Sequence, residues 1–461
     1  MEIKILNLNY RLFKIRHLFC ILASLLIFAS YLPSKVNAQS NLTGIFKNYH
    51  AAQTTGDYEI LSARNRLQFQ LTSGFDRGNF FSDIDFVHRY QDGREFELSL
   101  REAYVDLFFT DADLRIGKQN ILWGRANGGF VTDILTPVDL REFLTQDPED
   151  LRFGLTSLNA TYYNDAHTYQ IIVSPLFQKD LIPDPSSRWF PVQTLPSPLP
   201  LRFAEYDFTP TISDFQFAFK YSNRSLSWMD LDLKLLRWKH PMPAYAINVN
   251  LINLGELPSV TLRETYQNSL MAGMSASIQA GSNWTFTFES LFVQERLFTF
   301  LPVPISLLED ALTNLPAAIQ LVQQFDLRDD GYIKKKPWLN SMIGAQTEMF
   351  NTTVSAQFYL ETIFNYDEDI LSQQYFPYAT LLATRSFSRD RLRILALSRY
   401  NFYAEDYWLQ LQGVYEISDG FELSLGTNLF AGDDFTPFYG HFTFAQFRQN
   451  SFIFAQIALF F

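Results

Sequence analysis

The sequence predicts an all-β protein, a transmembrane antiparallel β-barrel of about 18 strands (range about 16–18) with long extracellular loops. Three observations predict this fold. The N-terminus has the organisation of a secretory leader, many segments alternate apolar and polar residues, and the chain ends on an apolar segment with an aromatic last residue. The strand assignment is ambiguous at the N-terminal end and in the stretch 256–280.

The first 38 residues have the pattern of a cleaved signal peptide. Basic residues precede the apolar run LFCILASLLIFASYL, and VNA before QS has the small residues of a signal-peptidase site. The run is shorter than the roughly 20 residues of a spanning helix, so we expect cleavage rather than a retained anchor. The one cysteine, Cys20, lies in this leader, so residues 39–461, the predicted single barrel domain, contain no thiol.

Composition excludes several classes of protein. The formal net charge of −12 repels nucleic acid, so we expect no nucleic-acid partner. After residue 38 there is no apolar run of about 18 residues, which excludes helical membrane spans. A membrane location would then require a closed barrel, because in lipid every backbone hydrogen bond must be satisfied internally.

Strand signals with a two-residue period recur along the chain. In DFQFAFKY at 214–221, aromatic residues occupy one face, and Asp214, Gln216 and Lys220 occupy the other. A soluble β-sandwich also alternates, but mid-strand charges suit a wet lumen, and an aromatic content of 16% suits a lipid-facing band. The other segments lie at 44–52, 64–71, 95–100, 230–236, 284–289, 354–364, 407–412 and 421–429.

Short turns alternate with long connections, as in bacterial barrels, so we assign the long connections to the extracellular side. They are 124–150, 178–210, 239–264, 298–335, 366–377 and 431–449. Helical spacing in 305–325 predicts two short helices on either side of Pro316. Three acidic clusters are expected in these loops, either solvated or bridging lipopolysaccharide through divalent cations: Asp329 and Asp330, Asp367 to Asp369, and Asp433 and Asp434.

The last segment, SFIFAQIALFF at 451–461, predicts a strand with a lipid-facing side that includes Ile457, Leu459 and Phe461. Its expected partner is the first strand, at 44–52, which would close the sheet and leave no edge. A terminal aromatic residue behind alternating apolar residues resembles the signal that the outer-membrane assembly machinery recognises. We therefore expect that machinery as a partner.

One region carries a more specific pattern. The segments LREAYVDLFF at 100–109, LRIGKQNILWGRANGG at 114–129 and TPVDLREF at 136–143 resemble the strand pair and following loop of outer-membrane porin-like families. The resemblance is to alginate-export-type channels and related, mostly uncharacterised proteobacterial barrel proteins, and it implies a channel for hydrophilic solutes or polymer. The matching residues are Arg115, Gly117, Lys118, Gln119, Trp123 and Gly124, with Lys118 where Arg is commoner.

Physical roles follow for several residues of this region. Gly117 would let a neighbouring group approach the wall, and Trp123 would anchor a strand end at the membrane interface. The loop that follows can fold into the lumen, with its charges either pinning it to the wall or contacting solute. Those charges are Arg125, Asp133, Asp139 and Arg141.

The candidate pore-lining residues are mostly basic. A positive wall would suit an anionic solute such as a uronic-acid polymer, but Glu95, Glu97, Asp230 and Asp232 are also predicted inside, which leaves ion selectivity open. The candidates are Arg64, Arg66, Arg101, Arg115, Gln119, Arg125 and Arg141.

These observations together predict a channel in the outer membrane of a Gram-negative bacterium, for passage or export of hydrophilic solutes such as an anionic polysaccharide. We predict no catalytic residues, cofactor or metal, and expect lipid, lipopolysaccharide and the solute as partners. One alternative is a transporter of hydrophobic compounds, because Trp408, Tyr359 and Phe430 are predicted to face inward. The other is a barrel-embedded enzyme, although the histidines form no recognisable catalytic pattern.

Overall fold

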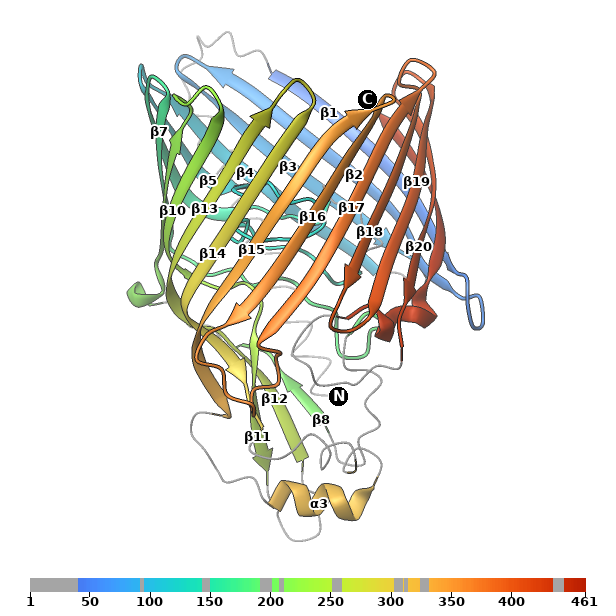
Figure 1. The fold of residues 1–461 in the computed structure, drawn as a ribbon. Coiled ribbons are helices and arrows are strands. Elements are labelled where there is room, and N and C mark those ends of the chain that lie inside the picture. The colour runs from blue at the N-terminus through green and yellow to red at the C-terminus, as the bar shows by residue number, and fades with distance from the viewer. Residues whose placement is uncertain are drawn as a thin grey trace.

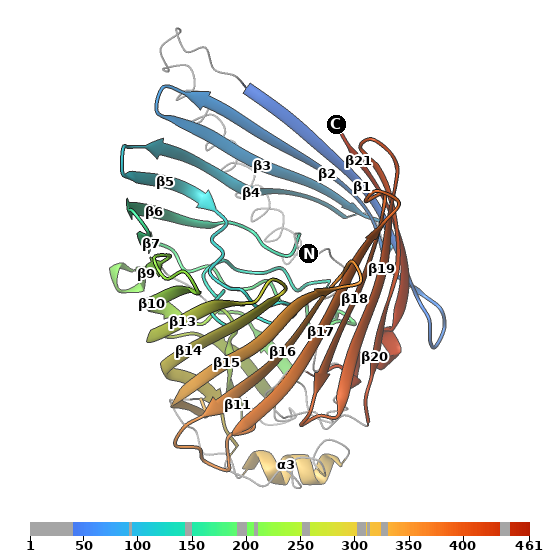
Figure 2. The same cartoon turned by 45° about the horizontal axis from the view of Figure 1, so that its top comes forward.

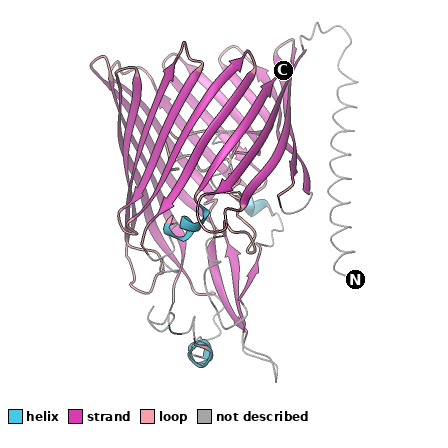
Figure 3. Cartoon of the chain, turned by 90° about the vertical axis from the view of Figure 1, so that its right-hand side faces the viewer, coloured by secondary structure: helices cyan, strands magenta, loops and turns pink. Residues whose placement is uncertain are grey.

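The fold comes from a computed structural model, which describes residues 40–91, 95–142, 150–190, 201–206, 211–250, 259–301, 310, 314–323, 331–433 and 443–461. The predicted leader, 1–38, lies outside the described residues. No helix in the described ranges is long and apolar enough to cross a membrane. Strands dominate the architecture (Figures 1 and 3).

Eighteen strands form one antiparallel sheet that closes on itself, which confirms the predicted fold class and strand count. Neighbours around the barrel follow the order of the chain, apart from three strands that leave it for a second sheet. The barrel strands are β1 (Ser40–Gln53), β2 (Ile60–Phe75), β3 (Gly78–Arg89), β4 (Glu95–Phe108), β5 (Ala112–Gln119), β6 (Leu155–Asn164), β7 (His167–Ser174), β9 (Gln216–Asn223), β10 (Met229–Lys239), β13 (Asn268–Ala280), β14 (Trp284–Thr299), β15 (Ile333–Met349), β16 (Thr352–Ile363), β17 (Tyr375–Phe387), β18 (Leu392–Asn401), β19 (Asp406–Ser418), β20 (Phe421–Ala431) and β21 (Phe452–Phe460).

The barrel closes between its first and last strands. β1 and β21 pair in antiparallel register from Ile45 opposite Phe460 to Gln53 opposite Phe452. One residue further, the Phe461 N–H donates to the Gly44 carbonyl at 2.9 Å, and the Gly44 N–H donates to the Phe461 carbonyl at 2.6 Å. A Cβ on Gly44 would lie 2.3 Å from the Phe461 ring, so the ring packs directly on this glycine and any side chain there would displace it.

The two faces of β21 show how the barrel separates lipid from lumen. Ile457, Leu459 and Phe461 are exposed on the outside, as expected, whereas Phe452 and Phe454 are buried on the inside. Similar rows of exposed Leu, Ile and Phe side chains occur on most other barrel strands. A closed antiparallel barrel with an apolar outer surface places the chain in an outer membrane.

The two ends of the barrel differ in their connections. Short turns and the C-terminus lie at one end, and the long connections lie at the other (Figure 1). The predicted alternation of short and long connections is therefore observed. Because bacterial barrels have short periplasmic turns, the end with the long connections is the extracellular one.

Three of the long connections build a second sheet and a helix beyond the extracellular rim (Figure 1). β8 (Leu201–Ala204) runs parallel to β12 (Ser259–Thr265), and β12 pairs antiparallel with β11 (Ala244–Asn250). The Ile247 N–H of β11 donates to the Gly331 carbonyl at 2.8 Å, which joins this sheet to the β14–β15 connection. The ambiguous stretch 256–280 thus contains β12 of the small sheet and the whole of β13 of the barrel.

The helix α3 (Leu315–Gln323) begins one residue before Pro316, a position where proline is well tolerated because its missing N–H has no partner in the first turn. The helix expected after Pro316 is therefore present. Its expected counterpart on the other side falls largely on 302–309 and 311–313, outside the described residues. Two short 3-10 helices, η2 (Ile212–Asp214) and η3 (Ala445–Asn450), complete the described elements.

The acidic clusters predicted in the loops are described only in part. Lys334 and Lys336 each lie 2.9 Å from the Asp367 carboxylate, and Lys334 lies 2.6 Å from Asp369. Two of the three carboxylates of this cluster thus form ion pairs with the protein's own lysines. Asp329, Asp330 and Asp434 lie outside the described residues.

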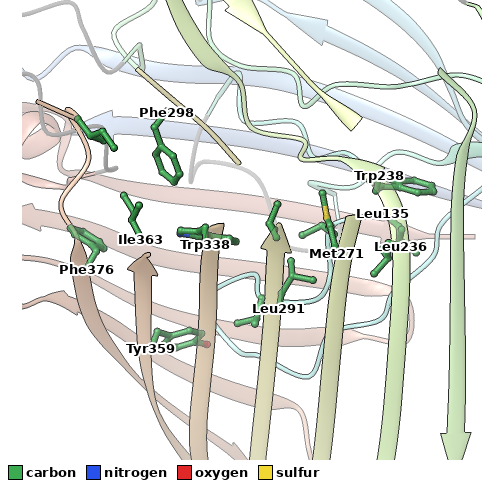
Figure 4. Close-up of a cluster of buried hydrophobic side chains, with 14 of the residues drawn as sticks. Leu135, Leu236, Trp238, Met271, Leu291, Phe298, Trp338, Tyr359, Ile363 and Phe376 are labelled. Atoms are coloured by element: carbon green, nitrogen blue, oxygen red, sulfur yellow. The ribbon is translucent and has the colours of Figure 1, made fainter. Parts of the chain in front are cut away.

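Part of the barrel interior is filled by the chain itself. An 18-stranded barrel would otherwise leave a wide aqueous channel. Apolar side chains of the β5–β6 connection, among them Leu135, pack with Leu236, Met271 and Leu291 of the wall in one buried cluster (Figure 4). The free passage is therefore narrower than the strand number alone would suggest.

Candidate functional site

Where the structure describes it, the connection between β5 and β6 enters the barrel (Figure 2). We call its described parts, 120–142 and 150–154, the inward loop. The Asn127 carbonyl accepts hydrogen bonds from the hydroxyl groups of Tyr359 at 3.1 Å and Thr380 at 3.0 Å. The Asn127 N–H donates to Gln357 Oε1 at 2.7 Å. The inward loop, which starts from β5, therefore reaches the wall at β16 and β17.

Two buried charges from the wall hold the middle of the inward loop. Lys234 Nζ donates to the Trp123 carbonyl and to Thr132 Oγ1, each at 2.7 Å. Glu289 Oε1 accepts from the Arg125 N–H at 2.8 Å and from the Thr132 hydroxyl at 2.9 Å. A buried charge that loses its partner is strongly destabilising, so this arrangement resists displacement of the loop.

Strand β4 contains a bulge that turns Arg101 inward. Asp83 of β3 pairs with Glu102, and the next residue, Ile84, pairs with Leu100, so Arg101 has no partner in the ladder. Such a bulge shifts the alternation of side chains by one residue. The Arg101 guanidinium consequently donates to two carbonyls of the inward loop, at 3.0 and 2.6 Å.

A cavity of about 250 Å³ lies between the inward loop and strands β1 to β4. Four of the candidate pore-lining residues border it: Arg64, Arg66, Arg101 and Arg141. Among the described residues, basic side chains outnumber acidic ones around the cavity, seven to five: Lys47, Arg64, Arg66, Arg89, Arg101, Lys118 and Arg141 against Asp85, Glu97, Asp139, Glu142 and Asp150.

Glu142 of the inward loop is bound by two arginines of the wall. Arg64 of β2 and Arg89 of β3 each form an ion pair with its carboxylate, and the Ser62 hydroxyl donates to Oε2 at 3.0 Å. Burial disfavours the charged form, but Arg64 and Arg89 outweigh it and lower the pKa of Glu142 to about 2. The carboxylate is therefore ionised at neutral pH.

Asp150 is also bound by two cations of the wall, one of which, Arg66, lies two residues after Arg64 on β2. Lys47 Nζ of β1 lies 2.8 Å from its Oδ2, and Arg66 of β2 forms a second ion pair with that oxygen. Arg66 also lies 2.6 Å from Asp85. Burial opposes ionisation here too, yet Arg66 and Lys47 lower the pKa of Asp150 to about 2.

Arg141 extends the network from the loop side. It lies 2.6 Å from Asp139 and 3.0 Å from Glu97 of β4, which in turn lies 2.8 Å from Arg89. Ion pairs between the inward loop and the wall, the first of the two roles expected for the loop charges, are thus present. A role in contacting solute stays a prediction.

The remaining pore candidates lie away from this cavity. Arg115 bonds Asp106 at 2.6 Å and stacks over the Tyr104 ring. Gln119 is fully buried, and its amide nitrogen donates to the Ser157 carbonyl of β6 at 3.0 Å. Arg125, in the inward loop, lies 3.1 Å from an aspartate of β10.

Two of the motif residues, Gly117 and Trp123, make contacts within the protein. Gly117 has φ +135°, and a Cβ there would lie 2.3 Å from the Ala103 carbonyl, so the close approach is to the backbone of β4. Trp123 does not lie at the membrane interface as expected. It is buried inside the barrel, and its indole N–H donates to Gln170 Oε1 at 3.0 Å. It lies in the inward loop, four residues after β5 ends at Gln119.

Several residues of the cavity were missed in the sequence. Asp85 and Arg89 fall on one face of DIDFVHR at 83–89, so the two-residue period would have found them. Glu142 and Asp150 belong to a loop without periodicity, and no local signal points to them. In the described part of the chain, no group of three or more His, Cys, Asp or Glu side chains is placed to hold a metal ion.

Comparison with solved structures places the architecture among known barrels. OccAB1 of Acinetobacter baumannii matches with a TM-score of 0.52 at 10% identity, over 93% of this chain and 98% of that chain. The fold is that of an outer-membrane porin. OccAB4 of the same organism has a TM-score of 0.51 at 9% identity, over 93% of this chain and 99% of that chain. OccK2 (OpdF) of Pseudomonas aeruginosa also has a TM-score of 0.51 at 9% identity, over 92% of this chain and 97% of that chain.

These neighbours support a porin-like barrel rather than the alginate-export type in particular. At such low identity they establish the architecture alone. No protein-family model matches the chain, and no curated protein matches it in sequence.

One loop residue gives the porin-like barrel a testable pH dependence. Asp180 is buried beside the inward loop and accepts the Val138 N–H at 2.9 Å; its burial raises its pKa from 3.8 to about 7. Its protonated form stabilises the fold fully below about pH 4, and this contribution is lost as the pH rises through 7. Asp180→Asn should therefore raise the melting temperature at pH 8.5 and change it little at pH 4. The corresponding gain in the free energy of unfolding at pH 8.5 has an upper bound of about 4 kcal/mol.

Thermal unfolding followed by the electrophoretic shift of the folded barrel would measure this effect. Asp165→Asn, in the exposed β6–β7 turn, is the matched control and should show no such pH dependence. Equal melting temperatures of the Asp180 variant and the wild type at both pH values would contradict the prediction.

Proposed function

We propose that the protein is an outer-membrane channel for hydrophilic solutes that carry carboxylate groups. The observation that carries the proposal is the row of cations on β1 to β3, two of which bind Glu142 and two of which bind Asp150 of the inward loop. Guanidinium groups match carboxylates in geometry and charge. A wall that holds the protein's own carboxylates is chemically suited to hold those of a solute.

The size of the cavity favours a small solute. About 250 Å³ is near the lower end of ligand pockets, and the inward loop is fixed at both walls. The finer form of the proposal, export of a uronic-acid polymer through an alginate-export-type channel, would need the loop to make way for successive sugars. We therefore place small carboxylates first and the polymer second.

Planar-bilayer recording of the refolded protein tests the proposal. Discrete openings should appear, and small carboxylates should block the chloride current. Arg64→Gln and Arg89→Gln should each lower the anion-to-cation permeability ratio by about threefold, because each removes a fixed positive charge from a confined passage. Reversal potentials in a salt gradient would give this ratio.

Arg385→Gln is the control, because Arg385 is exposed at the periplasmic end of β17 and stacks on Phe387. Its reversal potential should equal that of the wild type. A barrel that stays electrically silent, or a permeability ratio unchanged by both cavity variants, would count against the proposed channel.

A further inference from the structure

Two carboxylates of the inward loop, Glu142 and Asp150, are bound by the wall as ligands would be. Both oxygens of Glu142 are used: Arg89 Nε donates to Oε1, and Arg64 and Ser62 donate to Oε2. Asp150 Oδ2 forms ion pairs with Lys47 and Arg66. Multiple charge-assisted bonds to one carboxylate are typical of a binding site for an anion.

The donors and the acceptors belong to different parts of the protein. In the described part of the chain, the cations that form ion pairs with Glu142 or Asp150 lie on strands, one on β1, two on β2 and one on β3. The carboxylates lie on the inward loop, outside the hydrogen-bonded sheet. The binding groups are thus preorganised by the barrel whether or not the loop carboxylates occupy them.

The two positions are separated by a fixed step. Arg64 and Arg66 are next-but-one neighbours on β2, and their partners in β1 are Tyr49 and Lys47. Residues on one face of a strand repeat every two residues, about 7 Å apart. The wall therefore offers two carboxylate positions in line, separated by about the length of a six-carbon dicarboxylate.

We propose that Glu142 and Asp150 are resident competitors that occupy two subsites for a transported dianion, whose two carboxylates displace them. This inference rests on the proposed function. Cations left by a displaced loop carboxylate are neutralised at once by the incoming one, and the displaced carboxylate turns into the water of the passage, so that neither charge stays buried and unpaired. A monocarboxylate displaces one competitor, and a dicarboxylate of matching length displaces both.

The arithmetic of competition makes the proposal testable. Removing one competitor should lower the dissociation constant of any carboxylate by a factor that reflects how strongly that competitor occupied its subsite. Removing both should lower the dissociation constant of a matching dicarboxylate by the product of the two factors. For a monocarboxylate only one factor applies, because it uses one subsite. The probes are butyrate and malonate, which use one subsite, and adipate, which spans two.

The experiment measures dissociation constants from the block of ion current for wild type, Glu142→Gln, Asp150→Asn and the double variant. We expect roughly tenfold tighter binding of butyrate in each single variant, and roughly a hundredfold tighter binding of adipate in the double variant. Glu59→Gln, which alters an exposed ion pair with Arg188, should change none of these constants.

Wild-type protein provides a measurement that does not depend on folding of the variants. In it, adipate should bind tighter than butyrate, and malonate should bind like butyrate. Equal binding of adipate and butyrate, or variants that bind carboxylates no tighter than wild type, would overturn the inference while leaving the proposed function standing. Failure of every carboxylate to block wild type would instead reject the proposed function itself.

Discussion

Removal of Phe461 is expected to reduce the amount of folded barrel in the outer membrane by roughly tenfold, because the last residue completes the closure of the sheet. Without it, Gly44 loses two backbone hydrogen bonds, and the ring that packs on Gly44 and lies edge-on to Phe69 is lost. The heat-modifiable folded band in outer-membrane fractions would measure the effect.

Comparison of cells with detergent separates the two roles of this residue. We propose that the assembly machinery recognises the terminal strand; in that case the truncated chain should refold in detergent and yet fail to assemble in cells. Failure in both settings would assign the effect to closure alone. Phe350→Ala, an exposed aromatic on the β15–β16 turn, should assemble normally, and normal assembly of the truncated chain would refute the prediction.

Lys234→Met is expected to release the middle of the inward loop. The substitution removes the donor to the Trp123 carbonyl and to Thr132. It also removes the positive charge nearest to the buried carboxylate of Glu289, which bonds the same Thr132 hydroxyl. Loss of one partner of a buried pair lowers stability by about 3–5 kcal/mol. Because the loop narrows the passage, its release should roughly double single-channel conductance.

A second substitution distinguishes loss of the clamp from general damage. Lys234→Met with Glu289→Gln removes both charges, so the stability should largely return while the conductance stays high, since the loop still lacks the lysine. Lys335→Met, at an exposed position of β15, is the control and should leave conductance unchanged. Wild-type conductance in the Lys234 variant would show that the other contacts suffice to hold the loop.

Much of the fold could be read directly from local patterns. The two-residue period predicted the strands and their lipid-facing sides, because a barrel strand must meet lipid on one face and the lumen on the other. Arg64 and Arg66 were placed correctly on the inner side for the same reason. The chain order of short and long connections predicted which end carries the loops.

The bulge at Arg101 and the small extracellular sheet were not predictable in this way. A bulge leaves the composition of a strand unchanged, and β8 pairs with β12 across 50 or more residues of chain. Trp123 was placed at the interface because its local pattern matches a strand end; only the inward path of the following loop puts it inside.

By itself, the sequence determined a closed membrane barrel, its strand number and its outer surface, because these follow from short-range alternation and the demand that backbone groups be paired in lipid. Only the tertiary structure decided what the interior does. Glu142 meets Arg64 across 78 residues of sequence, and Lys47 meets Asp150 across 103. Such contacts depend on where the loop enters the lumen, and no local pattern of residues encodes that position.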